Sequence, residues 1–93
     1  MELITIGSGS AGNAYALVTK EEILLLEAGL PYKEVQKAID YRVSDIVGCL
    51  VSHEHSDHIG DGNEFAKHGI TIYGPAEVGK KIQNTLYNKK FKM

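Results

Sequence analysis

The chain reads Ser52-His53-Glu54-His55-Ser56-Asp57-His58-Ile59-Gly60-Asp61 directly after the apolar run of residues 46–51. This segment holds three of the four histidines in the chain. In an extended segment, side chains two residues apart point to the same side, so His53 and His55 can bind one metal ion together. Asp57 and His58 come where the chain turns into a helix, so they point elsewhere and can bind a second metal ion nearby.

The chemistry of these side chains indicates a transition-metal site. The alternative is a solvated polar loop, because loops are often rich in serine, aspartate and histidine. Chance rarely places three histidines and an aspartate at these spacings after an apolar strand. Imidazole nitrogens and carboxylate oxygens suit zinc, and also manganese or iron. The end of a strand, where the chain opens into a loop, is also where open α/β sheets bind their ligands.

Outward from this segment, short apolar runs alternate with helical patterns. The expected strands are residues 3–6, 14–19, 23–26, 46–52 and 70–73. The expected helices are residues 32–40, the stretch from Asp57 to Lys67, and residues 75–86, with Val78, Ile82 and Leu86 on one face. The basic tail, residues 88–93, has no core pattern. Such alternation predicts a sheet covered by helices, an α/β (α+β) fold.

Length and composition are those of a single small domain. The chain has 93 residues, of which 43% are hydrophobic and 24% charged. A net charge of −2 gives no basis for gripping nucleic acid by bulk charge, although bound metals would attract a phosphate. The one cysteine, Cys49, is expected to be a small buried hydrophobe. No signal peptide or membrane span is visible, so the expected location is the cytoplasm.

A glycine loop, Gly7-Ser8-Gly9-Ser10-Ala11-Gly12, matches the dinucleotide pattern G-x-G-x-x-G. That pattern has to open a crossover helix, whereas residues 14–18 are better suited to a strand. We therefore predict a tight connection between two strands. Ser8, Ser10 and Asn13 of this loop are expected to lie near the metal ligands and to line a substrate pocket.

Residues 53–58 match the H-x-H-x-D-H signature of the metallo-β-lactamase-fold superfamily. Residues 6–13 and Leu25-Leu26-Glu27-Ala28-Gly29 resemble the N-terminus of the branch that holds phosphoribosyl cyclic phosphodiesterase-like and nuclease-like hydrolases. The match runs in order from Met1 to about Pro75. The resemblance implies an αββα sandwich, of which residues 1–93 would form about the N-terminal half, a single and incomplete domain.

The resemblance also implies a two-metal site with two zinc ions when complete. His53 and His55 would bind the first ion, and Asp57 and His58 the second, with Asp57 as the catalytic residue that orients the attacking hydroxide. Glu27 stands where the family usually has aspartate. It would orient a ligand histidine, or else be a plain surface carboxylate. The family takes further ligands from downstream, where this chain offers only His68, expected to be a capping or solvated histidine.

The function that this pattern favours is metal-dependent hydrolysis of a phosphodiester in a small molecule or nucleotide. The alternatives are hydrolysis of another ester, a thioester or a lactam, an inactive or partial fragment, or a module that binds nucleotides through the glycine loop and basic tail. Neither metal has a full ligand set, and half a sandwich leaves a sheet face or edge uncovered. We therefore expect the chain alone to be a poor catalyst, completed by a missing C-terminal half or by self-association.

Overall fold

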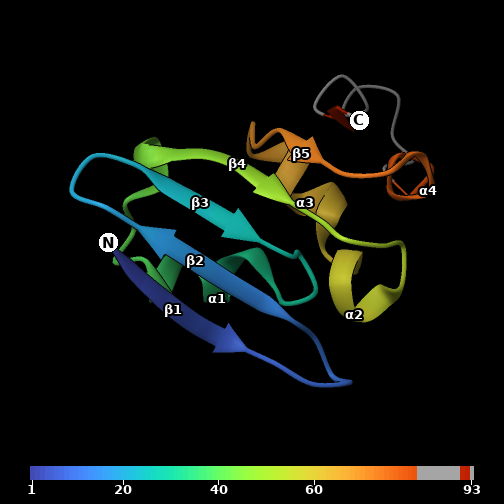
Figure 1. The fold of residues 1–93 in the computed structure, drawn as a ribbon, viewed down its shortest axis with the longest axis horizontal. Coiled ribbons are helices and arrows are strands. Elements are labelled where there is room, and N and C mark those ends of the chain that lie inside the picture. Colours follow the sequence, from blue (N-terminus) through green and yellow to red (C-terminus); the bar gives the residue numbers. More distant parts are fainter. Residues whose placement is uncertain (82–90, 93) are drawn as a thin grey trace.

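The computed structural model describes residues 1–81 and 91–92. Its strands form one sheet in sequence order, in which β1, β2 and β3 are antiparallel and the later pairs are parallel (Figure 1). The strands are β1 (Glu2–Gly7), β2 (Ala14–Val18), β3 (Ile23–Leu26), β4 (Ile46–Leu50), β5 (Ile72–Tyr73) and β6 (Phe91–Lys92). The helices are α1 (Tyr32–Ala38), α2 (Ser56–Ile59), α3 (Gly62–Lys67) and α4 (Ala76–Gly79), with a 3₁₀ turn at Val43–Asp45.

The expected mixed α/β fold is confirmed, and the glycine loop is a tight connection. It joins β1 to β2, which pair antiparallel, so no crossover helix follows it. The predicted hairpin of β2 and β3 is also present. No helix within residues 1–81 and 91–92 is long and apolar enough to cross a membrane.

Two sequence expectations were wrong. The stretch after Asp57 is not one helix, because α2 ends at Ile59 and α3 begins at Gly62. Gly60 and Gly62 lower the helix propensity there, and the Asp61 carboxylate instead accepts the Tyr32 N–H (2.7 Å) at the start of α1. The tail does contribute to the core, because Phe91 is half-buried, pairs with β5 and packs in space left open by Gly79.

Other element boundaries differ by one to a few residues. Strands β2 and β4 and helix α1 end before the expected positions, and β5 begins later. Helix α4 is described only as Ala76–Gly79, and the expected helical positions Ile82 and Leu86 lie outside the described residues.

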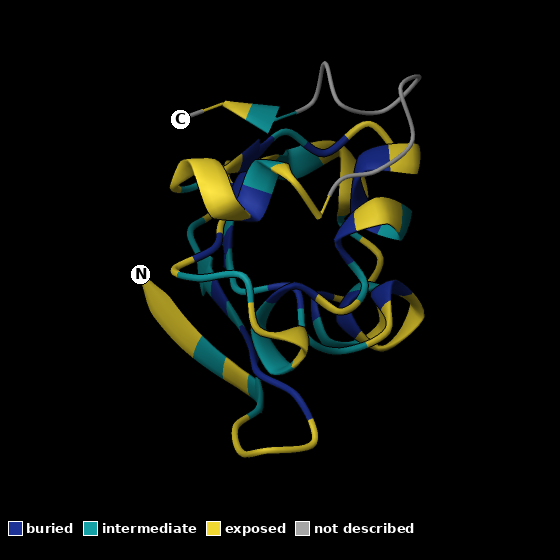
Figure 2. Ribbon diagram, turned by 90° about the vertical axis from the view of Figure 1, so that its right-hand side faces the viewer, coloured by how far each residue is buried: buried dark blue, intermediate teal, exposed yellow. Residues whose placement is uncertain are grey.

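One face of the sheet carries the hydrophobic core. Alternate strand residues such as Ala16, Ile23 and Leu25 are fully buried there, since successive side chains point to opposite faces. Helices α1 and α3 cover this face, and Phe65 of α3 packs edge-on against Tyr32 of α1, with ring centroids 5.2 Å apart. Burial falls toward the sheet edge, where β1 has exposed and half-buried residues but no fully buried one (Figure 2).

The opposite face carries apolar side chains that no described helix covers. The strand register aligns Tyr15, Leu26, Leu50 and Tyr73 in one row across β2, β3, β4 and β5. Leu50 is 44% exposed and Tyr73 36% exposed. Among the described residues, these apolar side chains are therefore partly accessible on this face.

The carboxyl end of β3 meets two distant segments through the backbone. Gly29 N–H donates to the Asn13 carbonyl (3.0 Å), and Asn13 N–H donates to the Asp57 carbonyl (2.7 Å). Ala28 N–H donates to the His58 carbonyl (2.6 Å). A Cβ on Gly29 would collide with the Asp57 carbonyl, so only glycine allows this close approach.

Gly29→Ala is therefore expected to lower the free energy of unfolding by about 3 kcal/mol or more, because the backbone segments must move apart. Gly69→Ala is the matched control. Gly69 has φ 86° and open space around its Cβ position, so Gly69→Ala should lower the free energy of unfolding by only ~1 kcal/mol through backbone strain. Urea unfolding of both variants checks this. A Gly29→Ala loss no larger than that of Gly69→Ala would contradict the close approach.

Cys49 is fully buried in β4, as expected, and its Sγ lies 3.6 Å from the Glu27 carbonyl oxygen. Burial raises the pKa of the Cys49 thiol, and the nearby Glu27 charge raises that pKa further. At a pH near the ordinary thiol pKa of about 8.5, the Cys49 thiol should therefore stay protonated and should not react with a disulfide reagent. Labelling should become fast only after unfolding in urea. Native-state labelling as fast as in urea would rule out this burial.

Candidate metal centre

The three histidines of the segment come together beyond the end of β4. The ring centroids of His53 and His58 lie 3.9 Å apart, and those of His53 and His55 lie 4.9 Å apart. Asp57 Oδ2 lies 3.5 Å from His58 Nε2. The short helix α2 produces this grouping, because it turns the chain back and brings His58 beside His53.

The donor types fit a transition metal, since imidazole and carboxylate are zinc ligands. His58 Nδ1 is buried and has no hydrogen-bond partner among the described residues, although Glu27 Oε1 lies 3.2 Å away. Within residues 1–81 and 91–92, no group of three or more His, Cys, Asp or Glu side chains is arranged to hold an ion. The exposed His55 ring and its neighbours would have to turn for their donor atoms to converge.

Glu27 points its carboxylate into this cluster. Its side chain is only 14% exposed, and its backbone has a positive φ of 65°, which is strained for a non-glycine residue. The Glu27 N–H donates to the Leu50 carbonyl (2.7 Å), which ties this bend to β4. The bend directs the carboxylate toward Ser52 and His58, so Glu27 is not a free surface carboxylate.

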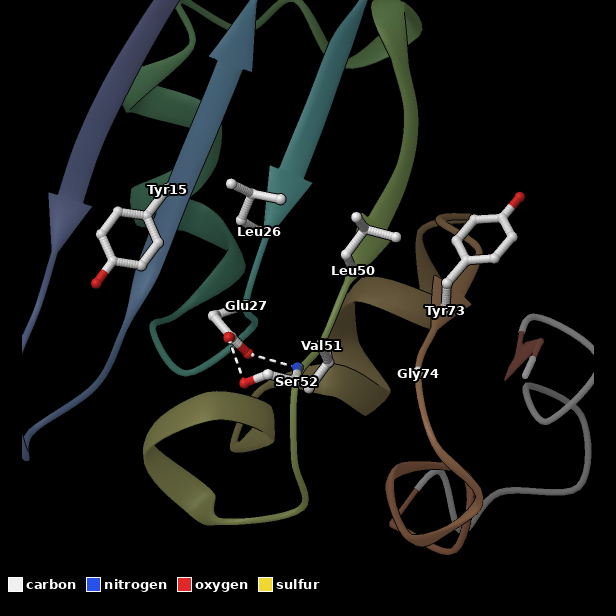
Figure 3. A pocket seen from close by; sticks show the side chains of 8 residues that line it. All are labelled: Tyr15, Leu26, Glu27, Leu50, Val51, Ser52, Tyr73 and Gly74. Carbon is white, nitrogen blue, oxygen red and sulfur yellow. Dashed lines mark hydrogen bonds between the residues drawn. The ribbon is translucent and has the colours of Figure 1, made fainter.

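Ser52 was not predicted from the sequence as a site residue. Its N–H donates to Glu27 Oε1 (3.0 Å), and its hydroxyl lies 2.6 Å from Glu27 Oε2 (Figure 3). The same hydroxyl lies 2.9 Å from His53 Nδ1. In the sequence, Ser52 could have been noticed only because its hydroxyl side chain directly precedes His53.

The glycine loop reaches this cluster through Asn13. Asn13 is buried, and its amide donates to the Asp57 carbonyl (3.0 Å) and to Asp57 Oδ2 (3.3 Å). The same amide donates to the Gly9 carbonyl (3.0 Å), so it also holds the loop closed. Ser8 and Ser10 are exposed in this loop, at the same end of the sheet as α2.

His68 lies apart from the other histidines. It caps the C-terminus of α3, with its Nδ1 2.9 Å from the Glu64 carbonyl oxygen, as expected for a capping histidine. Its ring stacks on Tyr32, with centroids 4.4 Å apart, and burial raises the pKa of that tyrosine.

A cavity of about 400 Å³ opens beside the Glu27–Ser52 pair on the uncovered face of the sheet (Figure 3). Its walls are mostly apolar, and among the lining residues Glu27 contributes a carboxylate and Ser52 an aliphatic hydroxyl. It is lined by Tyr15, Leu26, Glu27, Leu50, Val51, Ser52, Tyr73 and Gly74.

Comparison with known proteins adds a family match and named relatives. Residues 7–91 match the family profile described as the metallo-beta-lactamase superfamily. Exodeoxyribonuclease WalJ of Streptococcus pneumoniae is 35% identical over 86 residues, which cover 88% of this chain and 32% of the relative. Exodeoxyribonuclease YycJ of Bacillus anthracis is 34% identical over 87 residues, which cover 89% and 33%.

Among solved structures, the short form of human tRNase Z superposes with a TM-score of 0.75 at 20% identity, covering 99% of this chain and 40% of that chain. This likeness concerns the fold alone. The chain spans about a third of the length of the curated relatives named above.

Replacing both His53 and His55 by alanine should lower the transition-metal content, because these two side chains form the expected first metal site while Asp57 and His58 remain for the second. Metal content is measured after purification, after chelator treatment and after reloading with zinc. His68→Ala is the matched control and should keep its metal, because His68 lies outside the cluster. Unchanged metal content in the double variant would eliminate this site.

Proposed function

The chain belongs to the metallo-beta-lactamase superfamily, and from this membership we propose that it acts in metal-dependent hydrolysis of phosphodiester bonds. The observation that carries the proposal is the grouping of three imidazole rings and the Asp57 carboxylate beyond the end of β4. The relatives named exodeoxyribonuclease support the choice of bond, because the backbone of DNA is a phosphodiester.

We assign His53 and His55 to one metal ion, and Asp57 and His58 to a second. Zinc is the first expectation, and manganese or iron suit the same ligands. Divalent ions bound here would supply Lewis acidity, lower the pKa of water and stabilise charge on the attacking and leaving oxygens.

The protein's own contribution is orientation. Asp57 would accept a hydrogen bond from the attacking water and hold it in line with the scissile bond. Asn13 supports this role, because its amide donates to Asp57 Oδ2 and to the Asp57 carbonyl and so limits rotation of the carboxylate. The exposed Ser8 and Ser10 hydroxyls of the glycine loop would contact oxygens of a small-molecule or nucleotide phosphodiester.

Residues 1–93 alone should turn over slowly. Each metal would have two protein ligands here, whereas catalytic zinc usually has three and a water. An ion held by two side chains is bound weakly and positioned loosely, and positioning errors of about 1 Å can cost on the order of 100-fold in rate.

Turnover is tested with bis(p-nitrophenyl) phosphate, with added zinc or manganese. We expect slow, metal-dependent hydrolysis that a chelator stops. Asp57→Asn should lower kcat/KM by about 100-fold or more, because the amide would orient water less well and hold a cation less strongly. Asp40→Asn is the matched control, since Asp40 is exposed and asparagine tolerates its positive φ of 57°.

The mass in solution is measured alongside turnover. Hydrolysis of a lactam or thioester with no cleavage of the phosphodiester would refute the proposed substrate class. A monomer with rates typical of its longer relatives would contradict the expectation of a poor catalyst.

A further inference from the structure

The Ser52 hydroxyl stands between a carboxylate and an imidazole, and it has a single proton to give. Its Oγ lies 2.6 Å from Glu27 Oε2 and 2.9 Å from His53 Nδ1. An ionised carboxylate accepts hydrogen bonds and donates none, so the Ser52 proton must lie toward Glu27. The hydroxyl oxygen then has only lone pairs to offer His53, which must supply the proton of that second bond from Nδ1.

From this proton count we propose that Ser52 is a positioning residue that fixes His53 in the Nδ1–H tautomer and leaves its Nε2 lone pair free for a metal ion. The Glu27 carboxylate sets which way the Ser52 proton points, and the Ser52 oxygen in turn accepts the proton of His53 Nδ1. We call this series of hydrogen bonds the Glu27–Ser52–His53 relay. A metal-bound histidine commonly donates its other ring N–H in this way, and the partner fixes ring orientation and tautomer.

Backbone hydrogen bonds hold the Glu27 carboxylate in place against the Ser52 hydroxyl. The Ser52 N–H donates to Glu27 Oε1 (3.0 Å), so both carboxylate oxygens are engaged by the same residue. The carboxylate can therefore not turn away from the hydroxyl without losing a second hydrogen bond. Glu27 is also held in place by its own N–H, which donates to the Leu50 carbonyl (2.7 Å).

The proposal predicts a specific effect of Glu27→Gln. The glutamine oxygen must stay opposite the Ser52 N–H, which needs an acceptor, and this puts the glutamine NH₂ opposite the Ser52 hydroxyl. The NH₂ donates, so Ser52 turns its proton toward His53, and His53 must then accept at Nδ1. An isosteric change outside the histidine segment should thus move the His53 proton from Nδ1 to Nε2.

The first test is the histidine ¹H–¹⁵N correlation spectrum of the full metal-free chain, at a pH of about 8, where an ordinary imidazole is neutral. We expect a protonated Nδ1 and an unprotonated Nε2 for His53. Glu27→Gln should reverse this assignment. Ser52→Ala should shift His53 toward the Nε2–H tautomer that free imidazole side chains favour in water. Ser52→Thr should keep the wild-type Nδ1–H tautomer. Ser44→Ala, outside the site, should leave the His53 tautomer unchanged. A wild-type His53 with its proton on Nε2 overturns the proposal without any variant.

The second test is zinc affinity by chelator competition, and this arm rests on the proposed metal function. Ser52→Ala and Glu27→Gln should each weaken zinc binding by about 10-fold or more. Ser52→Thr and Ser44→Ala should bind like the wild type. Unaltered affinity in Ser52→Ala, with the tautomer released, would overturn the positioning role.

The two arms separate the proposals. If wild-type His53 has the Nδ1–H tautomer and Glu27→Gln reverses it, the Glu27–Ser52–His53 relay is confirmed even if the chain hydrolyses no phosphodiester. If zinc binds and turnover occurs while the tautomer is Nε2–H, the proposed function stands and the relay is wrong.

Discussion

The close backbone contact between Gly29 and the Asp57 carbonyl is the constraint on which the rest of the site depends. It allows three segments far apart in the sequence to share hydrogen bonds: the glycine loop through Asn13, the end of β3 and the histidine segment. Without the contact, the Asn13 amide could not reach Asp57. The site is thus built by main-chain atoms first, and its side chains are oriented second.

Glu27 shows how backbone conformation becomes chemistry. A positive φ of 65° at a non-glycine residue costs on the order of 1–3 kcal/mol, and such strain tends to occur at functional sites. Here it bends the chain so that the carboxylate faces Ser52 and His58. The hydrogen bonds to Ser52 offset part of that cost. The Glu27 carboxylate contacts both the N–H and the hydroxyl of Ser52.

The sheet divides the molecule into two unlike faces. Helices α1 and α3 cover one face, and an aligned row of apolar side chains lies on the other. Tyr15, Leu26, Leu50 and Tyr73 line the same cavity as the Glu27–Ser52 pair.

The amino-acid sequence by itself determined the alternation of strands and helices, the burial of Cys49 and the choice of His53, His55, Asp57 and His58 as candidate ligands. These features follow from local periodicity and spacing, which act over a few residues. It did not predict the break in the helix at Gly60, the packing of Phe91 against the core or the contacts of Ser52 with Glu27 and His53. Asn13 was expected near the metal ligands, but only the tertiary structure decided that its amide bonds to Asp57, 44 residues away. The contact of Glu27 with Ser52, 25 residues away, was likewise decided by the tertiary structure. Such pairs depend on strand order and register, because a shift of one residue turns every side chain to the other face.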